Sequence, residues 1–340
     1  KNKKILIVGA TSGDTGSAAL EAFKNKFNID LFILFPNKKV SKIQQKQMTT
    51  IFGRGCQSIA INSDFDGCQS IVKNLFKDLK FKDEFSLSAI NSINWARLIP
   101  QVVYYFYSAF RVGAPRKSVC FSVPTGNFGN IFAGWIARQM GLPVTKLICG
   151  SNKNDILNRF FKTGIMERKN VMPSYSPSMD IQVSSNFERL LFELFERDTD
   201  KLKKFMFQFE TNNKYDIGNS SLQKIKNLFF SHKVTDKEIL NEIKYTFEKN
   251  NYLIDPHTAV GLKAAREALS AGIIENDTPI VSLACAHPAK FPDVIEKSLK
   301  FEPKNPSILE KILTKDEFFE TLEVDINKIK SHIISNMRTQ

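Results

Sequence analysis

The fold class is indicated by residues 4–17, KILIVGATSGDTGS. Four consecutive aliphatic residues, Ile5 to Val8, are typical of a strand that is buried on both faces. A glycine-rich turn follows them and leads into a helical pattern. The same order of apolar run, turn and helix returns in residues 119–139, VCFSVPTGNFGNIFAGWIARQ. Because strands joined by crossover helices build parallel sheets, the sequence predicts an α/β fold.

The spacing of apolar runs predicts the order of elements along the chain. We expect strands at 4–9, 30–35, 58–62, 119–124, 144–150 and 279–285, and helices that open near Thr15, Ser41, Asp66, Ser92, Gly129 and Asn154. A length of 340 residues suits two domains. The stretch VGAPRKS at 112–118 predicts their boundary, which gives a smaller domain at 1–115 and a larger one at 116–340.

Two local patterns lie in the second half of the chain. Ser185 and Glu188 have the spacing of a capping box, so a helix is expected to begin after Ser185. The polar stretch TNNKYDIGNSS, residues 211–221, predicts a surface loop.

Composition restricts the class of protein. The net charge is +13, but the 48 Lys and Arg residues are spread along the chain, which favours a solvated surface over a nucleic-acid interface. Five cysteines without a C-x-x-C pair argue against a disulfide framework or a zinc site and favour a reducing, cytoplasmic compartment. No apolar run is long enough for a membrane span.

The first glycine loop, residues 9–17, has neither the dinucleotide nor the P-loop spacing. Its hydroxyl groups and backbone N–H groups at a helix start suit a carboxylate or a phosphate. Asp14 would repel such an anion and is expected to cap the helix instead. An ordinary glycine-rich turn accounts equally well for this loop taken alone.

The second glycine loop, residues 124–130 (PTGNFGN), also joins an apolar strand to an apolar helix. Two glycines three residues apart allow successive amides to converge on one anion, so this loop is a candidate phosphate site. An ordinary strand-to-helix turn is the alternative.

Two further stretches contain polar groups in apolar surroundings. Arg97 precedes a helix that is apolar on nearly every face and is therefore predicted to be buried, with Pro100 in its first turns. A buried arginine needs either a carboxylate or an anionic ligand.

The stretch SLACAHPAKFP, residues 282–292, follows a strand at the sheet edge where ligands gather in α/β folds. His257 is interpreted as a structural histidine.

Five ordered motifs together resemble the threonine synthase family: ATSGDTGS, NSINWAR, VPTGNFGN, DPHTAVG and AHPAKF. The resemblance covers nearly the whole chain, and SPSMDI at 176–181 is similar to the bacterial and fungal branch. It implies a fold-type II enzyme dependent on pyridoxal phosphate, with two open, mostly parallel sheets flanked by helices. It also implies a lyase that converts O-phosphohomoserine to L-threonine in amino-acid biosynthesis.

The resemblance further implies the roles of individual residues. The cofactor phosphate would be held by Gly126, Asn127, Phe128, Gly129 and Asn130. The substrate carboxylate would be held by Thr11, Ser12, Gly13, Asp14 and Thr15. The departing phosphate would be held by Asn91, Ser92, Asn94 and Arg97, with Lys290 as a second cation. Cys285 stands where the family usually has a hydroxyl residue beside the pyridine nitrogen, and a thiol is a weaker hydrogen-bond partner.

The family's Schiff-base lysine has no counterpart in the sequence, so we expect it upstream of Lys1 and assign no catalytic residue here. Phe76-Lys77-Asp78 and Phe81-Lys82-Asp83 resemble its surroundings but follow the first loop instead of preceding it. A phospho-lyase that releases a keto acid and a non-catalytic protein that binds phosphorylated metabolites are the alternative functions. A monomer or a homodimer is expected.

Overall fold

The computed structural model describes residues 4–11, 13–90 and 94–338. The chain forms two compact units, residues 1–94 with 304–340 and residues 95–303. This division differs from the expected boundary at 115/116 at two places. Residues 95–115 group with the second unit because helix α6 (Val102–Arg111) packs on helix α7 (Gly129–Gln139). Residues 304–340 group with the first unit because they add a strand to its sheet.

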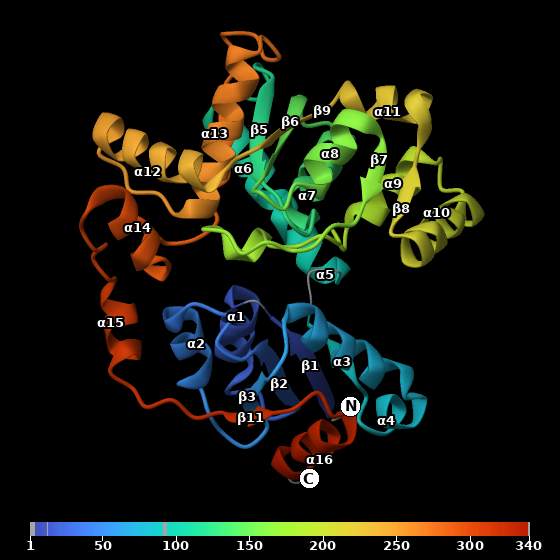
Figure 1. The fold of residues 1–340 in the computed structure, drawn as a ribbon, viewed down its shortest axis with the longest axis vertical. Coiled ribbons are helices and arrows are strands. Elements are labelled where there is room, and N and C mark those ends of the chain that lie inside the picture. Colours follow the sequence, from blue (N-terminus) through green and yellow to red (C-terminus); the bar gives the residue numbers. More distant parts are fainter. Residues whose placement is uncertain (1–3, 12, 91–93, 339–340) are drawn as a thin grey trace. The chain divides into compact units, whose positions relative to one another are not determined.

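The first unit contains, within the described ranges, a five-stranded parallel sheet in the order β11-β3-β2-β1-β4. Its strands are β1 (Ile5–Ala10), β2 (Ile29–Pro36), β3 (Cys56–Ile61), β4 (Ser88–Ala89) and β11 (Glu320–Leu322). Its helices are α1 (Asp14–Phe23), α2 (Lys42–Thr49), α3 (Phe65–Lys77), α4 (Leu79–Glu84), α15 (Ser307–Leu313) and α16 (Ile326–Asn336). Figure 1 shows α1 and α2 beside this sheet, with β11 at the edge next to β3.

Alternation along β2 explains why helices cover both faces of the first sheet. Leu31 and Ile33 pack with α1 and α2, whereas Phe32 and Leu34 pack with α3 and α16. Since successive side chains of a strand point to opposite faces, an uninterrupted apolar strand requires a cover on each side.

The second unit contains, among its described residues, a four-stranded parallel sheet in the order β10-β5-β6-β9. Its strands are β5 (Val119–Pro124), β6 (Val144–Ser151), β9 (Phe229–Lys233) and β10 (Ile280–Ser282), and an antiparallel pair is formed by β7 (Ile165–Glu167) and β8 (Lys214–Asp216). Its further helices are α5 (Trp95–Leu98), η1 (Ile99–Gln101), α8 (Ile156–Thr163), η2 (Pro177–Met179), α9 (Phe187–Leu194), α10 (Thr199–Asn212), α11 (Gly218–Lys226), α12 (Asp236–Asn250), α13 (Pro256–Ser270), η3 (Pro288–Lys290) and α14 (Pro292–Leu299).

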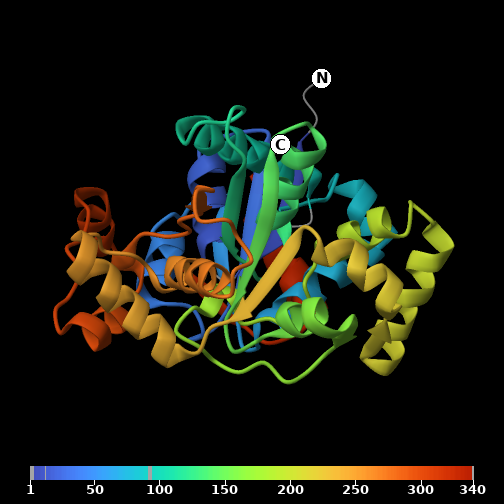
Figure 2. The ribbon, with the colours of Figure 1, turned by 90° about the horizontal axis from the view of Figure 1, so that it is seen from above.

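The two faces of the second sheet carry different helices. Cys120 and Ile148 pack with α13, whereas Phe121, Val123 and Leu147 pack with α6 and α7. Figures 1 and 2 agree that α12 and α10 lie at opposite ends of this unit, with the sheet between them. No helix in the described ranges has the length and apolar character needed to cross a bilayer.

The structure confirms the α/β class and the six predicted strands, with the last shortened to Ile280–Ser282. Strand β9 was not predicted because Ser231, His232 and Lys233 interrupt its apolar character. The predicted surface loop at 211–221 is wrong, since β8 and the start of α11 occupy most of it. Ser92, near which a helix was expected to begin, lies outside the described residues, and the following helix, α5, begins at Trp95.

Two predictions about helices are also wrong. Helix α9 begins at Phe187 with Asn186 as its N-cap, so Ser185 does not form the expected capping box. The Ser185 hydroxyl instead donates to Asn127 Oδ1. Helix α6 is not buried on every side, because Val103 and Tyr107 are each more than 60% exposed.

Candidate functional site

The turn between β5 and α7 is anchored in the core of the second unit. Phe128 has a left-handed backbone, with φ of 62°, and forms the N-cap of α7. Its ring is 1% exposed and packs against Phe187 and Phe229 at centroid distances of 4.9 and 5.9 Å. The side chain of Phe128 is therefore part of the core, and only its backbone is available to a ligand.

The amides of this turn form a donor-rich surface. Among the described residues, none of the backbone N–H groups of 126–131 donates a hydrogen bond. These groups lie at the start of α7, an 11-residue helix whose dipole places positive potential there. A row of backbone N–H groups that are free to donate at a helix N-terminus suits a phosphate group.

The carbonyl groups of the same turn are bound from the opposite side. The Ser184 hydroxyl donates to Gly126 O at 2.7 Å, and Asn186 donates to Asn127 O through its backbone N and its Nδ2, each at 3.1 Å. A Cβ atom at Gly126 would lie 3.2 Å from Met179 Cα, so glycine allows this close approach. Residues 179–186 thus support the turn, a role that no local sequence signal indicates.

Tyr105 connects helix α6 to this turn. Its hydroxyl donates to Asn130 O at 2.8 Å and lies 3.0 Å from Asn130 Oδ1. Burial, and then the charge of nearby Cys285, raise the pKa of the Tyr105 phenol well above its usual value. The phenol therefore stays protonated and acts as a donor.

The chain after β10 is held by Asp255 and Thr258. Cys285 N donates to Thr258 Oγ1 at 3.1 Å, and Ala286 N donates to Asp255 Oδ2 at 3.3 Å. Burial would raise the pKa of Asp255, but hydrogen bonds from His257 and Thr258 outweigh it and lower the pKa. His257 is a hydrogen-bonded structural histidine, as its sequence context predicts.

In the first unit, the loop before α1 is capped by Thr11 and not by Asp14. Thr11 Oγ1 accepts hydrogen bonds from Gly13 N at 3.0 Å and Gly16 N at 2.9 Å. Asp14 is already the first helical residue, so the expectation that it caps α1 is wrong. Thr15 lies in the same first turn, and Ser12 lies outside the described residues.

Gln44 of α2 lies against this loop and was not predicted. Gly13 has a φ of 138°, and a Cβ atom there would lie 2.5 Å from Gln44 Cδ. The Gln44 side chain is 1% exposed, and its Nε2 makes no hydrogen bond to the described part of the chain. A buried amide donor without an acceptor is costly, by about 1–3 kcal/mol, so it favours an anion close to this loop.

The expected substrate-phosphate residues are only partly described. Arg97 lies in α5, where burial lowers the pKa of its guanidinium. An anion beside this group would offset that cost. Asn94 is exposed at the end of the first unit's main segment, Lys290 is half-buried in η3, and Asn91 and Ser92 lie outside the described residues.

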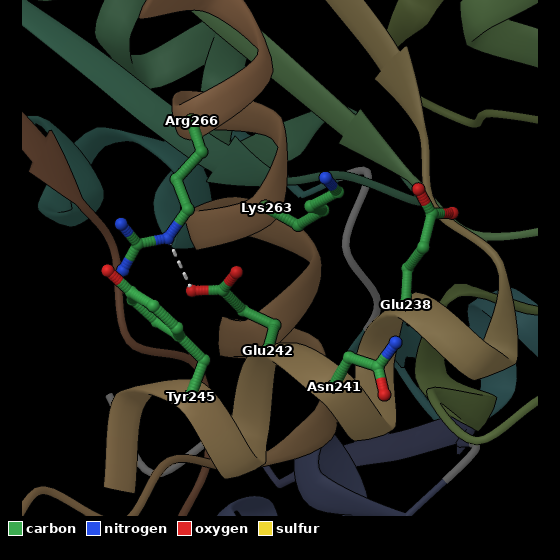
Figure 3. Close-up of a pocket in the computed structure, with 6 residues that line it drawn as sticks. All are labelled: Glu238, Asn241, Glu242, Tyr245, Lys263 and Arg266. Atoms are coloured by element: carbon green, nitrogen blue, oxygen red, sulfur yellow. Dashed lines mark hydrogen bonds and ion pairs between the residues drawn. The ribbon is translucent and has the colours of Figure 1, made fainter. Parts of the chain in front are cut away.

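A separate depression of about 380 Å³ lies between α12 and α13. It is lined by Glu238, Asn241, Glu242, Tyr245, Lys263 and Arg266 (Figure 3). Arg266 Nε is 2.9 Å from Glu242 Oε1, and its guanidinium lies 4.4 Å from the centre of the Tyr245 ring. Because this arginine is already paired and stacked, the depression lacks the open donors of the α7 turn.

Comparisons with known proteins agree with this geometry. A family model described as "Pyridoxal-phosphate dependent enzyme" matches residues 1–205, and one described as "Threonine synthase, C-terminal" matches 258–333. The threonine synthase of Pseudomonas aeruginosa is 43% identical over 334 residues, which cover 98% of this chain and 70% of that protein. The chain belongs to the threonine synthase family.

Solved structures support the same family assignment. The crystal structure of a PLP-bound threonine synthase from Brucella melitensis has a TM-score of 0.92 and 45% identity, covering 99% of this chain and 72% of its own. That of the yeast threonine synthase has a TM-score of 0.88 and 38% identity, covering 98% and 70%. The predicted fold-type II architecture is therefore confirmed, and the family's cofactor is pyridoxal phosphate.

The described residues fit this cofactor. The amides of 126–131, which donate no hydrogen bond within the described chain, match the needs of its phosphate, and the Cys285 side chain is a weak hydrogen-bond partner of the kind that could lie beside a pyridine nitrogen. The α7 turn and the Cys285 segment belong to one unit, whereas the loop containing Thr11 belongs to the other.

Proposed function

We propose that this protein is a pyridoxal-phosphate-dependent lyase that eliminates phosphate from O-phosphohomoserine and adds water at the β carbon to give L-threonine. The observation that carries the proposal is the row of undonated backbone amides at residues 126–131, in a chain whose relatives are threonine synthases. An anion with several oxygen atoms is the ligand that such a row binds best.

The proposed cofactor site lies in the second unit. The phosphate would be held by backbone amides of Gly126, Asn127, Phe128, Gly129 and Asn130, and the pyridine nitrogen would face Cys285. When bound, pyridoxal phosphate supplies an electron sink for carbanions. A thiol leaves the ring nitrogen without a charged partner, which disfavours transamination.

The proposed carboxylate site lies in the first unit. It comprises Thr11, Ser12, Gly13, Asp14 and Thr15. We add Gln44, a donor from helix α2 that lies against Gly13. The Thr11 hydroxyl acts as the helix cap, so its contribution is to hold the loop in shape. The unused Nε2 of Gln44 supports the assignment of an anion to this loop.

The proposed site for the departing phosphate consists of Asn91, Ser92, Asn94, Arg97 and Lys290. A guanidinium binds phosphate oxygens in a bidentate manner and neutralises the charge that develops as the leaving group departs. Arg97 is half-buried, and an anion beside its guanidinium would offset the cost of removing this charge from water, which supports this role.

No residue of 1–340 is proposed as the lysine that carries the cofactor. Lys77 ends α3, and the following Asp78 caps α4 and pairs with Lys330. Phe81 is buried in the core of the first unit. Both Phe-Lys-Asp segments therefore have structural roles.

The deciding experiment identifies the product. The protein expressed from its complete gene is incubated with pyridoxal phosphate and O-phosphohomoserine, and the reaction is followed by phosphate release and amino-acid analysis. We expect phosphate and L-threonine in equal amounts. Phosphate with 2-oxobutyrate would indicate the phospho-lyase, and tight binding without phosphate release would indicate the non-catalytic protein.

Arginine variants serve as controls in the same assay. Arg97→Ala should raise KM for O-phosphohomoserine by about tenfold or more, because a charged hydrogen bond contributes about 1.5–3 kcal/mol. Arg111 lies at the end of α6, and its guanidinium stacks on the Tyr107 ring. Arg111→Ala should therefore leave KM for O-phosphohomoserine unchanged. Equal kinetics for both variants would remove Arg97 from the phosphate site.

The proposed partner is the small-molecule substrate, and the proposed compartment is the cytoplasm, where amino-acid biosynthesis draws on soluble phosphorylated metabolites. The proposed assembly is a monomer or a homodimer. Sedimentation of the protein from its complete gene separates these two states.

A further inference from the structure

Two segments that the proposed function places against the cofactor are linked through one buried carboxylate. The turn between β5 and α7, residues 125–128, is called the phosphate turn below, after its proposed ligand. Behind it, a Cβ atom at Gly126 would lie 3.2 Å from Met179 Cα and 3.4 Å from Ser178 O. At the end of β10, Cys285 would face the ring nitrogen. Asp255 is the N-cap of α13. Its carboxylate is hydrogen-bonded to His257, which contacts the first segment, and to Ala286 N in the second.

The first connection runs through His257. Its Nδ1 is 3.0 Å from Asp255 Oδ1, and its Nε2 accepts a hydrogen bond from Ser178 N at 3.2 Å. A backbone N–H group can only donate, so Nε2 carries no proton and the ring proton lies on Nδ1. The imidazole is therefore held in one tautomer, and its ring packs on Phe291 at a centroid distance of 4.9 Å.

The second connection runs through Thr258. Its hydroxyl donates to Asp255 Oδ2 and accepts from Cys285 N at 3.1 Å. The same carboxylate oxygen accepts from Ala286 N at 3.3 Å. Asp255, His257 and Thr258 are each at most 5% exposed, so water cannot readily replace a lost bond.

We propose that Asp255, His257 and Thr258 form a positioning cluster that holds the support of the phosphate turn and the Cys285 segment in fixed register. The cofactor's phosphate and ring nitrogen are then bound by parts that cannot shift independently. This inference rests on the proposed function. The three side chains act through Ser178 and Cys285, so they are positioning residues and not catalytic ones.

The test separates the two bonds of His257. His257→Phe keeps a flat ring against Phe291 but removes both nitrogen atoms. His257→Asn replaces the donor at Nδ1, and His257→Gln replaces the acceptor at Nε2. Dissociation constants for pyridoxal phosphate and for inorganic phosphate are measured for each variant by quenching of tryptophan fluorescence, together with the urea midpoint of the ligand-free protein.

We expect both dissociation constants to rise about tenfold or more in His257→Phe and His257→Asn, because each leaves Ser178 N without its acceptor. His257→Gln should stay within about threefold of the original protein. If His257→Phe does not fold, the comparison of His257→Asn with His257→Gln still decides the question.

The matched control is His332→Phe in α16, since His332 Nδ1 is likewise paired with a carboxylate, Glu320 Oε2, at 3.0 Å. It should lower stability without changing either dissociation constant. Equal dissociation constants in the His257 and His332 variants would overturn the positioning cluster alone. Tight cofactor binding without threonine formation would overturn the proposed function alone, and a protein that binds neither ligand would overturn both.

Discussion

At the scale of single residues, buried polar groups carry most of the information about the site. Asp255 is 1% exposed and accepts hydrogen bonds from two side chains and from backbone N–H groups. Such a carboxylate is stable only because its ionised form is fully bonded. It therefore contributes to stability in a way that depends on pH.

We predict that Asp255 contributes to acid unfolding of the second unit. Its folded pKa lies below the usual 3.8, so its stabilisation is present above that pH and is lost as the pH falls further through the folded pKa. Asp255→Asn should lower the unfolding free energy at pH 7 by about 2–3 kcal/mol. It should also reduce the dependence of stability on pH below about 4, by up to one proton.

Both tryptophans, Trp95 and Trp135, lie in the second unit, so urea titrations followed by their fluorescence report on that unit. Titrations at pH 7, 5, 4 and 3 provide the comparison. If the unfolding free energies of the original protein and of Asp255→Asn differ by the same amount at all four pH values, Asp255 has no linked proton.

At the scale of elements, close contact between helices α6 and α7 fixes the first turn of α7. Tyr105 of α6 is fully buried, and its hydroxyl is bonded to Asn130 in the first turn of α7. Gly134 of α7 permits this approach, because a Cβ atom there would lie 2.5 Å from Tyr105 Cε1 and 3.0 Å from Leu147 Cδ2. The position of α7 thus depends on the absence of one methyl group.

We predict that Gly134→Ala destabilises the second unit although alanine is the better helix former. The gain in helix propensity is about 1 kcal/mol. A methyl group forced against a buried ring that cannot move costs about 1–3 kcal/mol, so the net change should be a loss of stability measured by the urea midpoint. In a Tyr105→Ala background the same substitution should cost much less, and an unchanged cost would contradict the contact.

At the scale of the whole molecule, the first unit is closed by residues far apart in the chain. Strand β11 pairs with β3, and Ile329 and Ile333 of α16 are fully buried with Leu6 and Phe32. The C-terminal segment is therefore part of the first core.

We predict that Ile329→Ala destabilises the first unit by about 2–5 kcal/mol, as expected for a large-to-small change at a fully buried site. Amide hydrogen exchange should become faster in β1, β2 and β3, while the tryptophan-detected transition of the second unit stays in place. Ile239→Ala, at a fully buried site of the second unit, should give the reverse pattern. Faster exchange in both sheets with either variant would contradict two separate cores.

The α/β class, the main strands and the two glycine turns could be predicted from the order of residues along the chain. These depend on local properties: apolar runs that suit buried strands, and glycines in strand-to-helix turns, such as Gly13 with its φ of 138°. The free backbone amides of the turn before α7 could be predicted for a related reason. A helix that follows a strand through such a turn exposes its first amides whatever lies elsewhere in the chain.

The distant segments that complete these local features, in contrast, are known only from the fold. Ser184 and Asn186 are joined to the turn by hydrogen bonds across more than 50 residues of sequence. His257 of the Asp255 cluster accepts a hydrogen bond from Ser178 N, which is also distant in sequence and lies next to Gly126 of the turn. Likewise, β11 joins the first sheet because parallel pairing needs only a free strand edge, not proximity in sequence. Local patterns cannot specify such partners, because a buried donor or acceptor can be satisfied by any complementary group that packing brings within reach.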